Sequence, residues 1–306
     1  MGLLSNEKLY DTIIVGGSYA GLSSALTLGR SLRNVLIIDS GNPCNKQTPH
    51  SQNFLTRDGM PPGEIAKIAK EEVSKYPTIE FYNGFAVNGR KISEGFLIET
   101  SDGKSFKGKK LIFASGILDI MHDIKGFAEC WGISVIHCPY CHGYEFRNKK
   151  TAILGEGDRL VHFTSLIKNL TDDVTLITSG KTVNNVDDIA TLKKNGVKVI
   201  EKKISEIEHH NGYVTKVIFS DGTAESFEAM YAPVPFRQHC SIPKELGCEM
   251  TDTGLINIDS LQKTSVDGIY AVGDNSNPLR SVALAVSSGN VAGVRVNSEL
   301  SAEMFL

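Results

Sequence analysis

The segment 137–142, with the sequence HCPYCH, holds the densest group of chemically active side chains in the chain. Cys138 and Cys141 are separated by two residues, so they can close a small disulfide ring, and in such a pair the pKa of one thiol falls toward neutrality. His142 follows directly and can carry a proton to or from a thiolate within hydrogen-bond reach. The spacing therefore predicts dithiol and disulfide chemistry at this pair, with His142 as general acid and base and Glu145 as a weaker assisting candidate.

Two other interpretations of segment 137–142 stay open. Histidine and cysteine are the ligands that zinc prefers, but four ligands within six residues can hardly all reach one tetrahedral ion, and the chain has no second Cys-x-x-Cys pair. An inert buried cysteine pair is the other alternative. We expect redox chemistry here and no metal.

A glycine-rich turn near the N-terminus has the order of a dinucleotide-binding motif. Gly16-x-Ser18-x-x-Gly21 follows the apolar, β-branched run Tyr10–Val15 and precedes the helical composition of Leu22–Arg30. In this motif the first glycine makes the tight turn and the third lets helix and strand pack closely, while a pyrophosphate lies on the helix N-terminus. Ser18 replaces the middle glycine, which loosens the approach of the ligand.

An acidic residue follows the glycine turn at the expected distance. Asp39 lies 23 residues after Gly16, at the end of the buried run Asn34–Ile38. This is where a carboxylate holds ribose hydroxyls. The predicted cofactor contacts of this unit are Gly16, Gly17, Ser18, Tyr19, Ala20, Gly21, Asp39 and Ser40.

A second glycine pattern, Gly155-x-Gly157-x-x-Leu160, is degraded. Leu160 stands where a small residue lets the helix pack against the strand. The next strand, Val174–Ile177, is followed by no acid for an NAD ribose and no arginine for a 2′-phosphate, and Lys181 is the only cation there. Gly155 and Gly157 can still contact NAD(P)H, so weak binding is expected, and a structural relic that binds no nicotinamide is the alternative.

The elements that position these motifs repeat once. A strand, a glycine turn, a helix, a second strand and an antiparallel meander occur first up to residue 116, with the meander over 79–112, and again over 117–235. The run Gly268–Val272 and a helix from about Ser281 to Leu300 then complete the first unit. The chain is predicted to be α/β, with two Rossmann-like dinucleotide-binding domains, the second inserted into the first, each carrying an antiparallel β-meander.

Composition excludes several classes of protein. The 306 residues are 41% hydrophobic and 22% charged, which is typical of a globular protein rather than a disordered one. A net charge of −3 gives no basic footprint for nucleic acid or an anionic membrane, and no apolar run approaches the roughly 20 residues of a membrane span. Six cysteines are too sparse for a disulfide scaffold, and no secretory signal pattern precedes the first strand. A cytoplasmic protein is expected, in which Cys44 is a small buried residue and Trp131 a packing residue.

With these motifs in place, the chain resembles the low-molecular-weight thioredoxin reductases, which are flavoproteins with two dinucleotide-binding domains, over essentially its whole length. The resemblance rests on Gly16–Gly21, on Ala114-Ser115-Gly116 where Ala-Thr-Gly is usual, on the Cys138/Cys141 pair and on Gly268–Asp274. It implies a homodimer and FAD, with residues 1–116 and 236–306 as the FAD-binding domain and 117–235 as an NAD(P)H-binding-like domain that carries the redox pair. The further FAD contacts that it implies are Ala114, Ser115, Gly116, Gly273, Asp274, whose carboxylate meets the ribityl chain, and Val282.

Two departures from the family point to a sub-branch. His142 stands where an aspartate is usual, and Ser179-Gly180 replace a doubled arginine. Together with the sequences CPYCHGYE and GGSYAG, they make the chain similar to the enzymes that oxidise dithiols of epidithiodiketopiperazine and depsipeptide natural products. The resemblance implies that Cys141 lies nearest the flavin and that Cys138 exchanges with substrate.

Three functions remain open at this stage. The first is a reductase that acts on a protein disulfide such as that of thioredoxin. The second is an oxidase that forms disulfides in a small-molecule dithiol with oxygen as acceptor. The third is a flavin-binding sensor without turnover, against which the intact cysteine pair beside a proton carrier argues.

Overall fold

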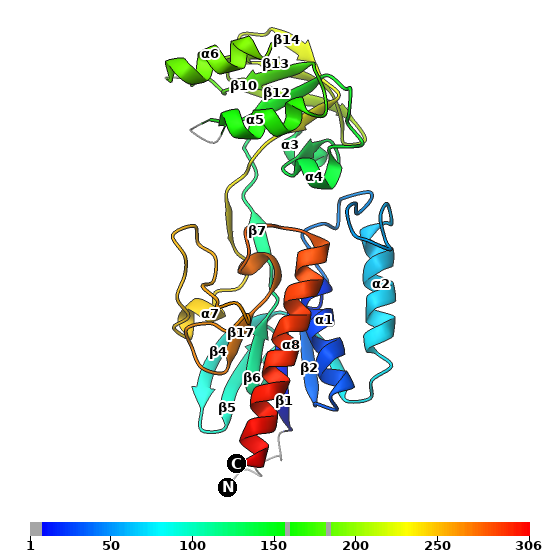
Figure 1. The fold of residues 1–306 in the computed structure, drawn as a ribbon, viewed down its shortest axis with the longest axis vertical. Helices are drawn as coiled ribbons and strands as arrows, with labels where there is room; N and C mark the ends of the chain where they lie inside the picture. The colour runs from blue at the N-terminus through cyan, green and yellow to red at the C-terminus, as the bar shows by residue number, and fades with distance from the viewer. Residues whose placement is uncertain (1–7, 157–159, 182–184) are drawn as a thin grey trace.

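The computed structural model describes residues 8–156, 160–181 and 185–306. Figure 1 shows two α/β bodies stacked along the long axis of the molecule and joined by extended chain at β7. The N- and C-terminal segments both belong to the same body, so the second body is inserted into the first, as the predicted fold class has it.

The first body is built on a mostly parallel sheet with the strand order β3-β2-β1-β6-β5-β4 and with β17 beside β6. Near-continuous apolar runs such as β1 and β2 form its centre because both of its faces are covered. Its strands are β1 (Leu9–Val15), β2 (Val35–Asp39), β3 (Ile79–Asn83), β4 (Ala86–Ile92), β5 (Gly95–Thr100), β6 (Ser105–Phe113) and β17 (Ile269–Ala271).

The expectation of an antiparallel meander over 79–112 is wrong for its first strand, β3. β3 pairs with β2 in parallel, Val35 opposite Ile79, because α2 (Pro62–Val73) supplies the crossover that parallel neighbours need. The antiparallel meander is limited to β4, β5 and β6. β6 also joins β1 in parallel, with Val15 opposite Phe113, so these two strands end side by side.

Two helices cover the sheet next to these strand ends. α1 (Tyr19–Arg30) and α8 (Val282–Phe305) pack against each other through small residues. A Cβ atom on Gly289 would lie 2.2 Å from the carbonyl oxygen of Ala20, and the Ser24 hydroxyl donates to the Gly289 carbonyl at 2.9 Å. The close approach places the beginning of α8 beside the beginning of α1, which puts both helix N-termini at one edge of the sheet.

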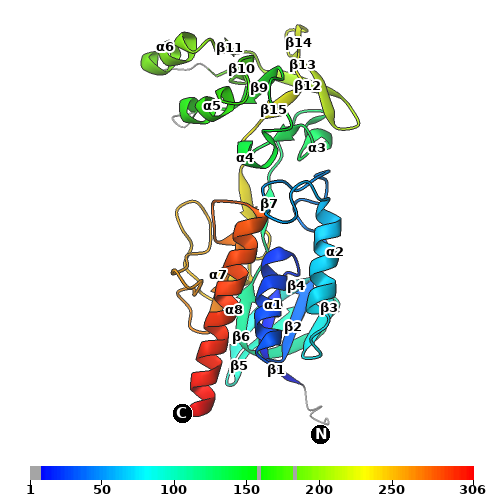
Figure 2. The same cartoon turned by 45° about the vertical axis from the view of Figure 1, so that its right-hand side comes forward.

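The two bodies are joined by a two-stranded antiparallel ribbon. It consists of β7 (Ile117–Asp119) and β16 (Phe236–Gln238), with Asp119 opposite Phe236. The domain boundaries expected from the sequence, 116/117 and 235/236, coincide with the first residue of each strand, and the division into domains stays a prediction. Figure 2 shows α4 (Pro139–His142) at the lower edge of the upper body, above the loop that follows β2.

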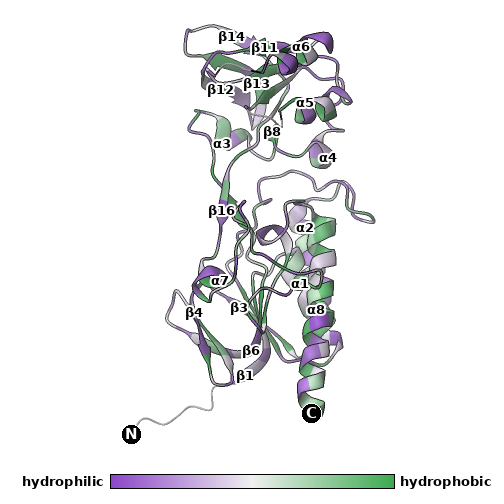
Figure 3. Cartoon of the chain, turned by 60° about the vertical axis from the view of Figure 1, so that its left-hand side comes forward, coloured by the Kyte–Doolittle hydropathy of each residue, from purple (hydrophilic) through white to green (hydrophobic). Residues whose placement is uncertain are grey.

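The inserted body repeats the glycine-turn architecture on a parallel sheet of order β11-β10-β9-β15-β8, with an antiparallel sheet β12-β13-β14 as its meander. In Figure 3, which colours the ribbon by hydropathy, hydrophobic residues lie along β13 and along parts of α8. The remaining elements are α3 (Phe127–Cys130), β8 (Val135–Ile136), β9 (Thr151–Leu154), α5 (Leu160–Lys168), β10 (Val174–Ile177), α6 (Val186–Lys194), β11 (Lys198–Ile200), β12 (Ile204–His210), β13 (Tyr213–Phe219), β14 (Ala224–Ser226), β15 (Ala229–Tyr231), α7 (Ile242–Glu245) and η1 (Gly273–Asn275). No helix among the described residues is long and apolar enough to cross a bilayer.

The packing of the glycine turn gives the first testable prediction. Gly21→Ala should lower the free energy of unfolding by about 2–3 kcal/mol, because its Cβ would lie 1.9 Å from the Gly16 carbonyl oxygen and backbone cannot move aside cheaply. Urea unfolding followed by circular dichroism measures the loss. Gly63→Ala is the matched control: it lies in α2 with no atom within 4 Å of the new methyl group, so it should stabilise the protein by up to about 1 kcal/mol. Equal stability of the two variants would contradict the packing argument.

Candidate active site

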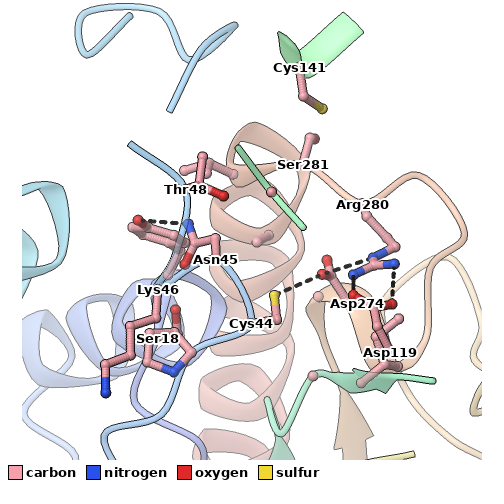
Figure 4. Close-up of a pocket in the computed structure, with 18 of the residues that line it drawn as sticks. Ser18, Cys44, Asn45, Lys46, Thr48, Asp119, Cys141, Asp274, Arg280 and Ser281 are labelled. Carbon is pink, nitrogen blue, oxygen red and sulfur yellow. Dashed lines mark hydrogen bonds and ion pairs between the residues drawn. The ribbon is translucent and has the colours of Figure 1, made fainter. Parts of the chain in front are cut away.

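One cavity of about 720 Å³ lies where the two bodies meet. Its wall combines the beginning of α1, the loop 42–53 after β2, the end of β6, the strand β7, the turn before α8 and the region of α4, as the close-up in Figure 4 shows in part. The volume lies within the usual range of about 300–1,000 Å³ for ligand sites. The predicted site residues that line it are Ser18, Tyr19, Ala20, Ala114, Ser115, Gly116, Cys141, His142, Gly273, Asp274 and Val282.

The glycine turn lies at the edge of this cavity and leaves the α1 N-terminus open. Gly16 has φ +107°, and a Cβ on it would lie 2.3 Å from the Ala114 carbonyl oxygen. Ser18 is the N-cap of α1, but its side chain makes no capping hydrogen bond, and the first turn holds no acid. Free N–H groups and the positive end of a 12-residue helix therefore face the cavity, an arrangement that fits a pyrophosphate.

Asp39 ends β2 as predicted and contacts the turn rather than the cavity. Its Oδ1 accepts a hydrogen bond from the Gly17 backbone N–H at 3.0 Å. A Cβ on Gly17 would lie 2.8 Å from the Asp39 Cβ, so the glycine is needed for this approach. Within the glycine turn and the end of β2, the predicted residues that do not line the cavity are Gly16, Gly17, Gly21, Asp39 and Ser40. Their role toward a cofactor stays a prediction.

The redox pair projects from the inserted body to the cavity. Cys138 and Cys141 are joined by a disulfide bond, with their Cα atoms 5.3 Å apart. Cys138 is the N-cap of α4, and its Sγ accepts a hydrogen bond from the Cys141 N–H at 3.1 Å. Cys141 lines the cavity and Cys138 does not, and Figure 4 shows the Cys141 sulfur at the cavity rim. The two sulfurs therefore face different surroundings.

Two histidines accompany Cys141 at the cavity. Burial lowers the pKa of His142, so its imidazole is neutral near pH 7 and able to accept a proton. Burial and the positive charge of Arg280 lower the pKa of His137 to about 4, and its ring stacks on Trp131 with 5.6 Å between centroids. Glu145 is exposed and does not line the cavity, so the structure does not bring it to the redox pair.

A buried ion pair lies in the same wall. Arg280 donates from Nη1 and Nη2 to the two carboxylate oxygens of Asp119 at 2.8 and 2.9 Å, and its Nε lies 3.6 Å from Asp274 Oδ2. Burial raises the pKa of Asp274. The Cys44 thiol opens onto the cavity 3.9 Å from Asp274 Oδ2, while desolvation by the surrounding protein atoms and the Asp274 charge raise its pKa to about 11. The expectation that Cys44 is buried is therefore wrong.

The second glycine pattern lies outside this cavity. Gly155 packs close to Leu160, whose Cδ1 would lie 3.1 Å from an added Cβ. Lys181, the cation that follows the end of β10, forms an ion pair with Glu156 of the glycine loop at 2.6 Å. Gly157 lies outside the described residues.

Sequence reasoning missed three groups in the cavity wall. Asp119 and Arg280 are distant in sequence and were not singled out, although each follows a recognised motif by only a few residues. The loop 42–53 contributes many side chains, of which only Cys44 was singled out from the sequence. Trp131 is buried, as expected of a packing residue, and it also lines the cavity. No group of three metal-binding side chains is found among the described residues.

Comparison with known proteins places this geometry in a family. The model of the family "Pyridine nucleotide-disulphide oxidoreductase" matches residues 10–289. The thioredoxin reductase tcpT of Claviceps purpurea is 31% identical over 98% of this chain and 97% of its own length. The thioredoxin reductase sirT of Leptosphaeria maculans is 32% identical over 97% of this chain and 96% of its own length. The crystal structure of an oxidoreductase from Agrobacterium tumefaciens is 34% identical, covers 96% of this chain and 99% of its own, and superposes with a TM-score of 0.90.

The low pKa of His137 predicts a pH dependence of stability. The unfolded chain binds a proton at this imidazole below its ordinary pKa of about 6.5, whereas the folded protein stays neutral there down to about 4. The stability that the neutral imidazole contributes is therefore complete above pH 6.5 and is lost as the pH falls toward 4, by about 3 kcal/mol in the free energy of unfolding. His137→Gln should flatten this slope in urea unfolding at pH 4.5–7. His210→Gln, which removes an imidazole exposed on β12, is the control, and an unchanged slope in His137→Gln would contradict the assignment.

Proposed function

The chain belongs to the pyridine nucleotide-disulphide oxidoreductase family, and we propose that it is an FAD-dependent disulfide oxidoreductase of the thioredoxin reductase type. In this proposal the Cys138–Cys141 pair carries two electrons between bound flavin and a thiol or disulfide substrate. The observation that carries it is the position of Cys141, which reaches from the inserted body to a cavity walled by the glycine turn of the other body.

The described residues fit FAD on several counts. The open N-terminus of α1 suits the pyrophosphate. Gly16 and Gly21 allow the close backbone packing that places this helix end at the cavity. Asp39 would hold the adenosine ribose, and Asp274 the ribityl chain. FAD supplies the two-electron chemistry when bound, while this chain binds it, orients it and moves protons at sulfur.

The thiol chemistry follows from the different surroundings of the two sulfurs. A substrate thiolate attacks Cys138 Sγ, which forms a mixed disulfide and releases Cys141 as a thiolate facing the cavity. The second substrate thiolate attacks the substrate sulfur of the mixed disulfide, which completes the substrate disulfide and releases Cys138. Two electrons thus move from the substrate dithiol to the cysteine pair. Neutral His142 accepts a proton from the attacking thiols and returns it to the leaving sulfurs, and the reductive direction reverses each step.

A second candidate function is an oxidase that forms disulfides in a small-molecule dithiol with oxygen as the acceptor. The ion pair between Lys181 and Glu156 favours it, because the cation available for a nucleotide phosphate is already paired and an acid stands in the glycine loop. A carboxylate there repels the pyrophosphate. In both functions we propose that NAD(P)H binding is weak. A homodimer, a cytoplasmic location and a thioredoxin-like protein as alternative substrate stay predictions.

One set of assays tests the function and its direction. The purified protein should be yellow and should release FAD on denaturation, and a protein that binds no FAD would end the proposal. Anaerobic flavin bleaching is then compared for NADPH, NADH and a small dithiol. We expect the dithiol to bleach the flavin and oxygen to restore it, with NADPH and NADH differing by less than about tenfold, since one lysine cannot replace bidentate arginine contacts. Fast bleaching by NADPH, with a hundredfold preference over NADH and turnover of thioredoxin, would instead establish the reductase.

The proton-transfer role of His142 gives a separate prediction. His142→Ala should retain fold and FAD but slow thiol–disulfide exchange by about 10²- to 10⁴-fold at pH 7, the usual worth of a placed general base. The loss should shrink toward high pH, where thiols ionise without help. His142→Asp should restore part of the rate, and His210→Ala is the control. Exchange that is unchanged at every pH in His142→Ala would show that the histidine is structural.

A further inference from the structure

The guanidinium group of Arg280 is locked in one orientation. Arg280 stands directly before Ser281, the N-cap of α8, and Asp119 stands on β7 in the ribbon between the two bodies. Their bidentate pair occupies Nη1 and Nη2, and the two side chains are only 17% and 6% exposed. Because the guanidinium is planar and rigid, fixing these two nitrogens also fixes the direction of Nε.

The remaining nitrogen faces Asp274. Arg280 Nε is buried and has no hydrogen-bond partner among the described residues, and it lies 3.6 Å from Asp274 Oδ2. At this separation the attraction is that of an ion pair rather than a good hydrogen bond. Cys44 is the other polar neighbour of this oxygen, at 3.9 Å, as the dashed lines in Figure 4 show. Asp274 is thus held by charge while its oxygens retain the capacity to accept a hydrogen bond from a ligand in the cavity that it lines.

We propose that Arg280, oriented by Asp119, is a positioning residue for FAD, which keeps the Asp274 carboxylate ionised and directed into the cavity to accept a hydrogen bond from the ribityl chain. The inference rests on the proposed FAD site. The proposal gives the ion pair between Arg280 and Asp119 a function. Asp119 lies on β7, the strand that leads to the redox domain, and through Arg280 it fixes the Asp274 carboxylate that holds the cofactor.

The charges around Asp274 explain why the cation is needed. The groups that face it are Arg280 before α8, Asp119 on β7 and the Cys44 thiol in the loop after β2. Burial and the negative charge of Asp119 raise the pKa of Asp274, and Arg280 alone opposes them by charge. Removing the guanidinium should therefore let Asp274 take up a proton at higher pH. The share of FAD affinity that depends on the carboxylate is present above this pKa and is lost as the pH falls through it.

The test is the rate of FAD release after dilution of the FAD-loaded protein, followed by flavin fluorescence between pH 5 and 9. Arg280→Met should speed release by about 10- to 100-fold at pH 7, the size expected for a hydrogen bond to a charged group, and the acceleration on acidification should begin at higher pH than in the wild type. Asp274→Asn should speed release and abolish this pH dependence. In the Asp274→Asn background, Arg280→Met should add less than about threefold, because Arg280 acts through that carboxylate.

Controls separate this role from simple destabilisation. Arg280→Met leaves Asp119 buried without a partner, so the pair Arg280→Met with Asp119→Asn is measured as well, and circular dichroism reports folding of each variant. Leu279→Ala, an exposed neighbour, should behave as the wild type. Equal acceleration by Arg280→Met with and without the Asp274 carboxylate, or an unshifted pH profile, would overturn the inference. A wild-type protein that carries no FAD would overturn the proposed function instead.

Discussion

The architecture depends on the close approach of backbone segments around one turn. Gly16 lies against the Ala114 carbonyl, Gly21 against Gly16, and Gly289 against Ala20, each at a distance that a Cβ atom would prevent. These contacts bring the ends of β1 and β6 and the beginnings of α1 and α8 to one edge of the sheet. Interiors are close-packed and resist local expansion, so this edge is rigid. A rigid edge with the open N-terminus of α1 would hold the anionic cofactor of the proposed function in a fixed position.

The charges in the cavity wall are arranged around that rigid edge. Burial makes an unpaired charge costly, and it is the reason that Asp119 and Arg280 occur as a bidentate pair and that His137 stays neutral. Desolvation by neighbouring protein atoms and the charge of Asp274 raise the pKa of the Cys44 thiol, so it stays neutral as well. A neutral Cys44 thiol is a weak nucleophile, so it does not compete with the redox pair for the substrate although it opens onto the same cavity. The reactive sulfur chemistry is thereby confined to Cys138 and Cys141.

The sequence predicts the features whose causes are local. β1, α1 and β2 follow from apolar runs that flank a glycine turn, and the Cys138–Cys141 disulfide follows from spacing alone. The parallel pairing of β3 was missed because local composition does not distinguish an edge strand of a parallel sheet from the first strand of a meander. Contacts between distant segments were missed for a related reason. Nothing near Asp119 indicates Arg280, since their pairing depends on how the ribbon crosses the start of α8.

The inserted body has a use in this arrangement that does not depend on nucleotide binding. β8 lies at the edge of its parallel sheet and leads directly into segment 137–142, so the sheet fixes where the cysteine pair begins. Gln47 of the loop after β2 donates from Nε2 to the Ala128 and Glu129 carbonyls at 3.0 and 2.9 Å, which ties α3 to the other body. These contacts support Cys141 at the cavity whether or not a nicotinamide binds near Gly155. A substitution that weakens the second glycine pattern would therefore remove one electron donor without disturbing the thiol chemistry. For that reason the weak nucleotide site that we propose is compatible with an intact redox pair in one chain.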